Sequence, residues 1–178
     1  MVLVLLMLPF SSIDALYFGN NLKIDNIKSE TSVSPQITTG GGNVYVVWDD
    51  KDSVYFRAVK KNGSVFGETI ILGKSINSSV GPQIAATESG NVYVVWAETN
   101  NTSGESRIVF RGSANDGDNF GRKVLYTYFD PNSDPSPQIA ATESGNVYVV
   151  WRSEGLRLVE VRDHGKLFAD GIVLSNRK

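Results

Sequence analysis

A block of 15 residues, PQIAATESGNVYVVW, occurs twice in this chain without a single difference, from Pro82 to Trp96 and from Pro137 to Trp151. A looser third copy, PQITTGGGNVYVVW, ends at Trp48. The three tryptophans are 48 and 55 residues apart, and periods of this size are typical of repeat architectures built from small β-sheets. The chain is therefore predicted to consist of one structural unit copied three times.

The middle copy predicts four short strands. Residues 82–87 begin with a proline, which is tolerated at the first position of a strand. Residues 88–91 contain Gly and Asn, which accept the positive φ values of tight turns. Residues 92–96 are all β-branched or aromatic and form the clearest strand. Segments 107–111 and 123–128 supply the third and fourth strands. Because both faces of the second strand are apolar, it is expected to be covered on both sides.

The other two copies repeat this pattern. Their third strands are predicted at 54–58 and 156–161, and their fourth strands at 69–72 and 172–174. No segment has a helical period, so the chain is predicted to be all-β. Units of four short antiparallel strands are typical of the blades of a β-propeller. The blades are expected at about 33–75, 80–130 and 135–176.

The turn before the fourth strand of the middle copy, 113–120, resembles the Asp-box, or bacterial neuraminidase repeat, whose pattern is Ser-Xaa-Asp-Xaa-Gly-Xaa-Thr-Trp/Phe. Asn stands here where Asp is usual, and its side chain is expected to close the turn onto backbone N–H groups. The matching positions of the three copies are Ser113, Asn115, Gly117 and Phe120; Asp163, Gly165 and Phe168; and Gly63 and Phe66. The resemblance covers nearly the whole chain after residue 18 and implies a sialidase-like β-propeller.

Sialidases are known for three arginines that grip the substrate carboxylate, a Tyr/Glu nucleophile pair and an Asp acid. The resemblance therefore raises the question of whether this chain carries them. Arg57 and Arg111 occupy equivalent positions on third strands, but Val159 stands at that position in the third copy and breaks a triad. The catalytic residues stay unassigned.

The frame of the repeat extends toward the N-terminus. Phe18 and Gly19 match Phe-Gly pairs in the first and second copies, so residues 18–28 are predicted to hold the outer strand of a preceding blade. Propellers close with about four to eight blades. Three blades and one extra outer strand therefore predict an open or incomplete propeller. Three arrangements are compatible with this prediction: an open arc of blades, a ring completed by another copy or another chain, or a fragment of a longer propeller.

Residues 2–10 form an apolar run, followed by two serines and a cleavage point after Ala15. This pattern predicts a signal peptide over 1–15, although the usual basic residue before the run is missing. The run is about half as long as a membrane-spanning helix, so membrane attachment is expected only if the segment stays uncleaved. The protein is expected to be secreted or at the cell surface. The alternative is that the run is an apolar strand of a truncated preceding unit.

Charge and composition exclude several classes of function. The chain has 17 basic and 19 acidic residues and no basic run, so a nucleic-acid partner is not expected. It has no cysteine, which excludes disulfides and thiolate metal sites. The lone histidine, His164, has no partners that would make it a metal ligand or a triad member. No metal site and no cofactor is predicted.

The connections between strands alternate between two rims. The turns at 40–43, 88–91 and 143–146 share one rim with the Asp-box turns and are nearly identical, so we call it the repeated rim. The opposite, divergent rim has loops of different length and composition, which is where binding surfaces are usually built. Charged loop residues are usually just solvated. The candidate binding residues of the divergent rim are Asp50, Glu98, Arg152, Glu154 and Tyr128.

Three functions are compatible with these features. The preferred interpretation is an exported interaction or glycan-binding module without demonstrable catalysis, whose partners are glycans or another chain. The second is a fragment of a sialidase-like glycoside hydrolase, an exo-α-sialidase. The third is a structural protein of the cell surface. The repeated tryptophans do not favour sugar stacking, because their strand position predicts that they lie in the core between blades.

Overall fold

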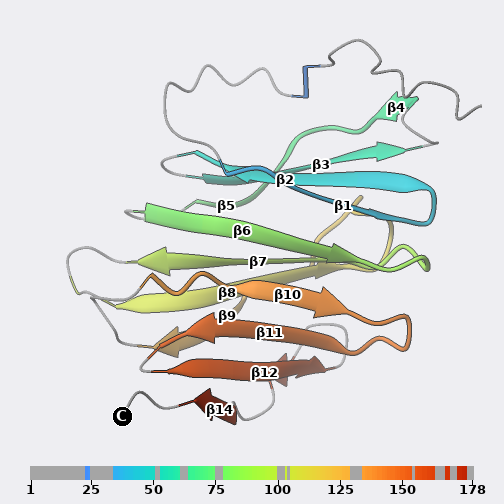
Figure 1. Ribbon diagram of the computed structural model, residues 1–178. Coiled ribbons are helices and arrows are strands. Elements are labelled where there is room, and N and C mark those ends of the chain that lie inside the picture. Colours follow the sequence, from blue (N-terminus) through green and yellow to red (C-terminus); the bar gives the residue numbers. More distant parts are fainter. Residues whose placement is uncertain are drawn as a thin grey trace, which may run out of the picture.

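The computed structural model describes residues 23–24, 34–50, 53–60, 64–74, 78–99, 103, 105–128, 134–153, 155–162, 167–168 and 172–175. Every regular element in this part of the chain is a β-strand. The strands form three antiparallel sheets, each built from one continuous stretch of sequence. The sheets stack face to face, with the first at the top and the third at the bottom of Figure 1. The prediction of an all-β fold of four-stranded blades is confirmed.

In the first and third sheets the outer strand is divided into two short pieces that both pair with the third strand. The first sheet consists of β1 (Gln36–Gly40), β2 (Asn43–Asp49), β3 (Ser53–Lys60), β4 (Val65–Phe66) and β5 (Ile70–Lys74). The second consists of β6 (Ser78–Ala86), β7 (Val92–Thr99), β8 (Ser106–Ser113) and β9 (Val124–Tyr128). The third consists of β10 (Gln138–Ala141), β11 (Val147–Arg152), β12 (Leu156–Arg162), β13 (Leu167–Phe168) and β14 (Ile172–Ser175).

Two hydrophobic cores lie between the stacked sheets. Alternation along β7 divides its side chains between them, because successive residues of a strand point to opposite faces. The first core joins the first and second sheets and contains Val92, Val94 and Trp96. The second joins the second and third sheets and contains Tyr93, Val95 and Ala97. Every residue from 92 to 97 is buried, which confirms that this strand is covered on both faces.

The tryptophans are buried, as predicted. Trp48, Trp96 and Trp151 are 4%, 0% and 1% exposed, and the last two belong to the two cores between sheets. The central strands are longer than predicted. The hydrogen-bonded ladder of β7 and β8 continues past the apolar segment to Thr99 and Ser106. The residues at these strand ends are polar, so the sequence shows no strand pattern there.

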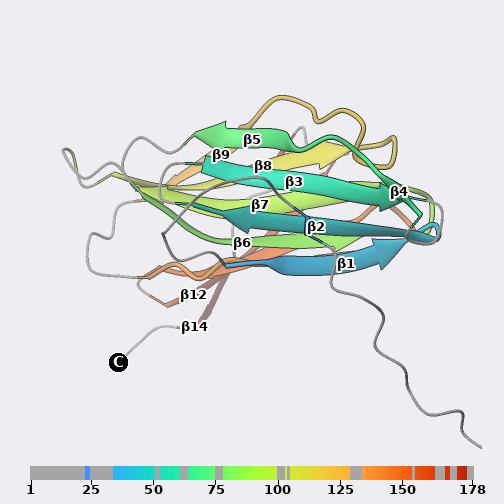
Figure 2. The same cartoon turned by 90° about the horizontal axis from the view of Figure 1, so that it is seen from above.

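The two rims lie at opposite ends of the strands. The turns that join β1 to β2 and β6 to β7 lie together at the right of Figures 1 and 2, at the repeated rim. No helix in the described part of the chain is long and apolar enough to span a membrane. The predicted signal peptide, 1–15, lies outside the described residues.

Candidate functional site

The Asp-box-like turn of the second sheet is closed by its own side chains. Ser113 Oγ accepts a hydrogen bond from Gly117 N (3.1 Å) and donates one to Asn115 Oδ1 (2.8 Å). Asn115 Oδ1 also accepts from Asn119 N (3.1 Å). Gly117 has a φ of 77°, which side chains disfavour. The asparagine therefore closes the turn as its position in the repeat predicts.

The aromatic residue of this turn reaches the neighbouring sheet. Phe120 lies edge-on to Phe56 of β3, with ring centroids 4.8 Å apart. Phe66, its equivalent in the first copy, is 37% exposed. Gly63, Asp163 and Gly165 lie outside the described residues, and of Phe168 only the backbone is described.

Glutamates on the repeated rim connect one sheet to the next. Glu88 Oε2 accepts a hydrogen bond from Gly41 N (2.9 Å) in the first sheet. Glu143, its equivalent in the third sheet, accepts from Glu88 N at Oε1 (2.7 Å). Each carboxylate thus binds the turn of the preceding sheet. The series ends at Gly41, which has no side chain to continue it.

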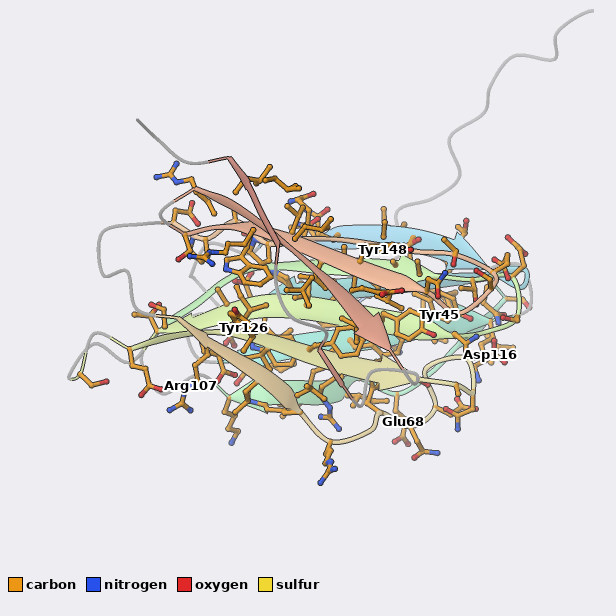
Figure 3. All side chains as sticks on the ribbon, turned by 90° about the horizontal axis from the view of Figure 1, so that it is seen from below. Tyr45, Glu68, Arg107, Asp116, Tyr126 and Tyr148 are labelled. Carbon is orange, nitrogen blue, oxygen red and sulfur yellow. The ribbon has the colours of Figure 1, made fainter. Side chains whose placement is uncertain are left out.

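Asp116 makes a second connection at this rim, shown in Figure 3 beside Tyr45. Its Oδ1 accepts hydrogen bonds from Tyr45 Oη (3.0 Å) and Asn43 Nδ2 (3.2 Å) of the first sheet. Burial, together with the hydrogen bond to Asp116 and the negative charge of Asp116, raises the pKa of Tyr45 to about 12. The equivalent of Asp116 in the third copy is His164, which lies outside the described residues.

The two arginines considered for a carboxylate grip are bound to backbone carbonyls instead. Arg111 donates to the carbonyl oxygens of Gly121 (2.7 Å), Phe120 (2.9 Å) and Leu72 (2.9 Å), the last in the first sheet. Arg57 donates to Gly67 O and Ile24 O. Each guanidinium also lies over the aromatic ring of its turn, 5.9 Å from the centroid of Phe120 and 5.3 Å from that of Phe66.

The carbonyls of Ile24 and Leu72 hold the same place in the repeat. Ile24 accepts from Arg57 as Leu72 accepts from Arg111, and the two acceptors are 48 residues apart, the same shift that relates Phe18 to Phe66. The outer strand expected at 18–28 stays a prediction, because only Lys23 and Ile24 of this segment are described. Arg111 therefore joins the second sheet to the first, and Arg57 joins the first sheet to Ile24. A substrate carboxylate would have to displace these bonds.

We expect Arg111→Met to lower the free energy of unfolding by about 2–3 kcal/mol, because three carbonyl oxygens lose a charged donor. Urea unfolding followed by tryptophan fluorescence measures this loss. Arg107→Met is the matched control on the same strand. Its ion pair with Glu105 is about one-third exposed (35%), so its loss should cost at most about 1 kcal/mol. Equal costs would contradict the role of Arg111.

The structure describes the side chains of three of the five candidate binding residues of the divergent rim, Asp50, Glu98 and Arg152, and each belongs to a different blade. Asp50 is bound to its own hairpin, accepting from Ser53 N (2.8 Å) and Tyr55 Oη (2.8 Å). Arg152 is exposed at the end of β11. The backbone of Tyr128 pairs with Ser106, but its side chain and the whole of Glu154 lie outside the described residues.

Glu98 is partly buried, and its partner was missed in the sequence. Its side chain is 15% exposed. Oε1 accepts hydrogen bonds from Trp96 Nε1 (3.0 Å) and Lys123 Nζ (2.7 Å). The ammonium of Lys123 also lies 5.4 Å from the centroid of the Trp96 ring. Lys123 precedes β9, 25 residues away, and no motif links the two positions.

A second ion pair lies beside it on this rim. Arg107 binds Glu105 through both Nε and Nη2, each at 3.2 Å. These hydrogen bonds, and then the charges of Glu105 and Glu98, raise the pKa of Arg107. The described rim of the second sheet therefore combines two carboxylates with two cations, which suits hydrogen bonding to polar ligands. It does not offer the free carboxylate pair that glycoside hydrolysis requires.

A buried carboxyl group, Asp49, lies at the same end of the first sheet. It is 6% exposed and accepts a hydrogen bond from Ser34 N (2.9 Å). Burial and the neighbouring charge of Asp50 raise its pKa, against the backbone donors that lower it. The sequence suggested only loop charges here. In the described residues no group of three or more His, Cys, Asp or Glu could hold a metal ion.

Asp49→Asn should become more stable relative to wild type as the pH rises through the mildly acidic range. A carboxyl group with a raised folded-state pKa binds its proton more tightly when folded. Its contribution to stability is therefore greatest at low pH and falls as the pH rises from the ordinary value of 3.8 through the raised pKa. Urea unfolding at several pH values from about 3.5 to 7 measures this difference. Parallel pH profiles would contradict the raised pKa.

No protein-family model matches the chain, and no curated protein matches it. Among solved structures, the chain is similar to the GH43 protein BlXynB of Bacillus licheniformis, a β-propeller. The two are 13% identical with a TM-score of 0.51, over 82% of this chain and 32% of that one. The likeness shows the fold. The chain spans about a third of the length of that protein, and its three sheets are propeller blades in an open stack.

Proposed function

We propose that this chain is an exported interaction module made of propeller blades, which binds glycans through its divergent rim. The observation that carries the proposal is the unequal use of the two rims. Side chains of the repeated rim bind the neighbouring sheet, as Glu88, Glu143 and Asp116 do. On the divergent rim, Glu105 and Arg107 stay about one-third exposed (35% each). Guanidinium and carboxylate groups in this position can hydrogen-bond sugar hydroxyls.

The assignment to the Asp-box, sialidase-like propellers is part of the proposal. The side-chain hydrogen bonds of Ser113 and Asn115 and the positive φ of Gly117 support it. The recurring pair of a third-strand arginine and the aromatic residue of the turn supports it as well.

A fragment of a glycoside hydrolase is the second candidate, favoured by the likeness to a GH43 propeller. The carboxyl groups argue against it within the described residues. Glu98 and Glu105 are paired with cations, and Asp49, whose raised pKa would suit an acid catalyst, is too buried to reach a substrate. The carbonyl-bound arginines argue against a sialidase in particular.

A glycan array and a fluorogenic sialoside assay on the purified chain separate these functions. Binding without hydrolysis is expected. Arg107→Met should reduce binding, whereas Lys60→Met, which breaks a comparable ion pair with Asp118 on the repeated rim, should leave it unchanged. Hydrolysis would establish the enzyme instead, and absence of both activities would favour the structural role. N-terminal sequencing of the mature protein tests export, with cleavage after Ala15 expected.

A further inference from the structure

The outer face of the third sheet exposes side chains whose equivalents in the other sheets are buried. Tyr148 of β11 holds the same place as Tyr45 and Tyr93. Those two tyrosines are 0% and 1% exposed, whereas Tyr148 is 36% exposed. Figure 3 looks onto the molecule from the side of the third sheet, with Tyr148 labelled.

Two leucines of the same sheet show the same contrast. Leu156 of β12 is 40% exposed, whereas its equivalents Val54 and Ile108 are 1% and 0% exposed. Leu174 of β14 is 51% exposed, whereas its equivalent Leu72 is 1% exposed. The surface built from Tyr148, Leu156 and Leu174 thus has the composition of an interface between sheets, and apolar patches of this kind mark interaction sites.

Glu160 distinguishes this outer face from the inner ones, and Arg152 adds a second charge to it. Arg152 is paired with Leu156 at one end of β11, and Glu160 is paired with Tyr148 near the other end. The equivalents of Glu160 are Gly112 in the second sheet and Ala58 in the first, and those of Arg152 are Ala97 and Asp49. Charges of opposite sign therefore stand at opposite ends of the same two strands, on the face that carries Tyr148.

Arg152 disfavours a further blade stacked in the same way as the first three. In the core between the second and third sheets, the equivalent Ala97 packs in the same cluster as Trp151. Asp49 holds this position in the first sheet and is also buried. Arginine is larger than either residue, so at this position it would occupy the space that the tryptophan of a following blade requires. A blade of another chain added to the outer face of the first sheet is also disfavoured, because Val46 and Trp48 on that face are already buried, at 6% and 4% exposed.

We propose that the outer face of the third sheet binds the same face of a second copy of this chain. The two copies are related by a two-fold axis that lies between the sheets and runs across the strands. This arrangement lays Arg152 of each copy over the strand end that carries Tyr148 and Glu160 in the other, because the ends of the strands are exchanged. It buries Tyr148, Leu156 and Leu174 between them. A self-complementary patch is what a two-fold interface requires, and the inference does not depend on glycan binding.

Sedimentation equilibrium of the full chain tests the proposal. The wild type is expected to be dimeric at about 100 µM, and Leu156→Arg should raise the dissociation constant at least about tenfold. Ile37→Arg is the control, because Ile37 is an apolar residue of the first sheet that is 68% exposed. It should leave the dissociation constant unchanged. Circular dichroism checks that both variants fold. A monomeric wild type, or a dimer that Leu156→Arg does not weaken, overturns the proposal.

A charge exchange tests the two-fold arrangement itself. Arg152→Glu places like charges opposite each other and should raise the dissociation constant by about tenfold. The double variant Arg152→Glu/Glu160→Arg restores opposite charges and should return the constant to within about threefold of wild type. Dimers that the double variant does not rescue would rule out this orientation of the copies.

Discussion

Trp96→Ala should lower the free energy of unfolding by about 3–5 kcal/mol, as expected for a large buried aromatic side chain. Trp96 is 0% exposed in the core between the first and second sheets. The substitution also removes the indole N–H that binds Glu98 and the ring beneath Lys123. Urea unfolding monitored by circular dichroism measures the loss.

The control for Trp96 is Ile37→Ala, which removes an apolar side chain that is 68% exposed. Its effect should stay within about 0.5 kcal/mol. A Trp96→Ala variant as stable as the wild type would mean that the core between the first and second sheets is not packed as described. The interpretation of the sheets as stacked blades would then be wrong.

Gly117→Val is expected to cost at least about 3 kcal/mol, from left-handed backbone strain and overpacking together. Gly117 has a φ of 77°, and a Cβ at this position would lie 2.4 Å from the tip of the Phe56 ring. That ring cannot move aside, because Phe56 is 0% exposed and is held between Tyr45 and Phe120. Thermal unfolding of the wild type and of Gly117→Val measures the loss of stability.

Gly81→Val separates the two causes of that cost. Gly81 also has a positive φ, 48°, but nothing lies within 4 Å of a Cβ built there. This variant should lose only the backbone term of about 1–2 kcal/mol. If both variants lose the same amount, the contact between the Asp-box-like turn and the first sheet carries no stability.

The elements of each blade could be predicted from the sequence because their signals are local. The run 92–96 is β-branched and aromatic on both faces, and the structure buries all of it. The side chains of Ser113 and Asn115 close a turn within seven residues of sequence, so the motif alone indicates their contacts.

Contacts between sheets could not be predicted in this way, because they depend on how the blades stack. The hydrogen bond from Gly41 N to Glu88 joins residues 47 positions apart. The ion pair of Glu98 and Lys123 joins β7 to the segment before β9, 25 residues away. Tyr93 and Tyr148 lie in identical 15-residue blocks, yet they are 1% and 36% exposed. Their difference comes from the neighbouring sheet, which no local pattern encodes.

The identical blocks that contain Glu88 and Glu143 have a consequence for how a gene of this kind changes. A crossover between them excises 55 codons and leaves the reading frame intact. The shortened product would have a glutamate and a tryptophan at the positions of Glu88 and Trp96. The hydrogen bond from Gly41 N to the glutamate would therefore be kept. Loss or gain of one whole blade therefore keeps the contact between the first sheet and the blade that follows it.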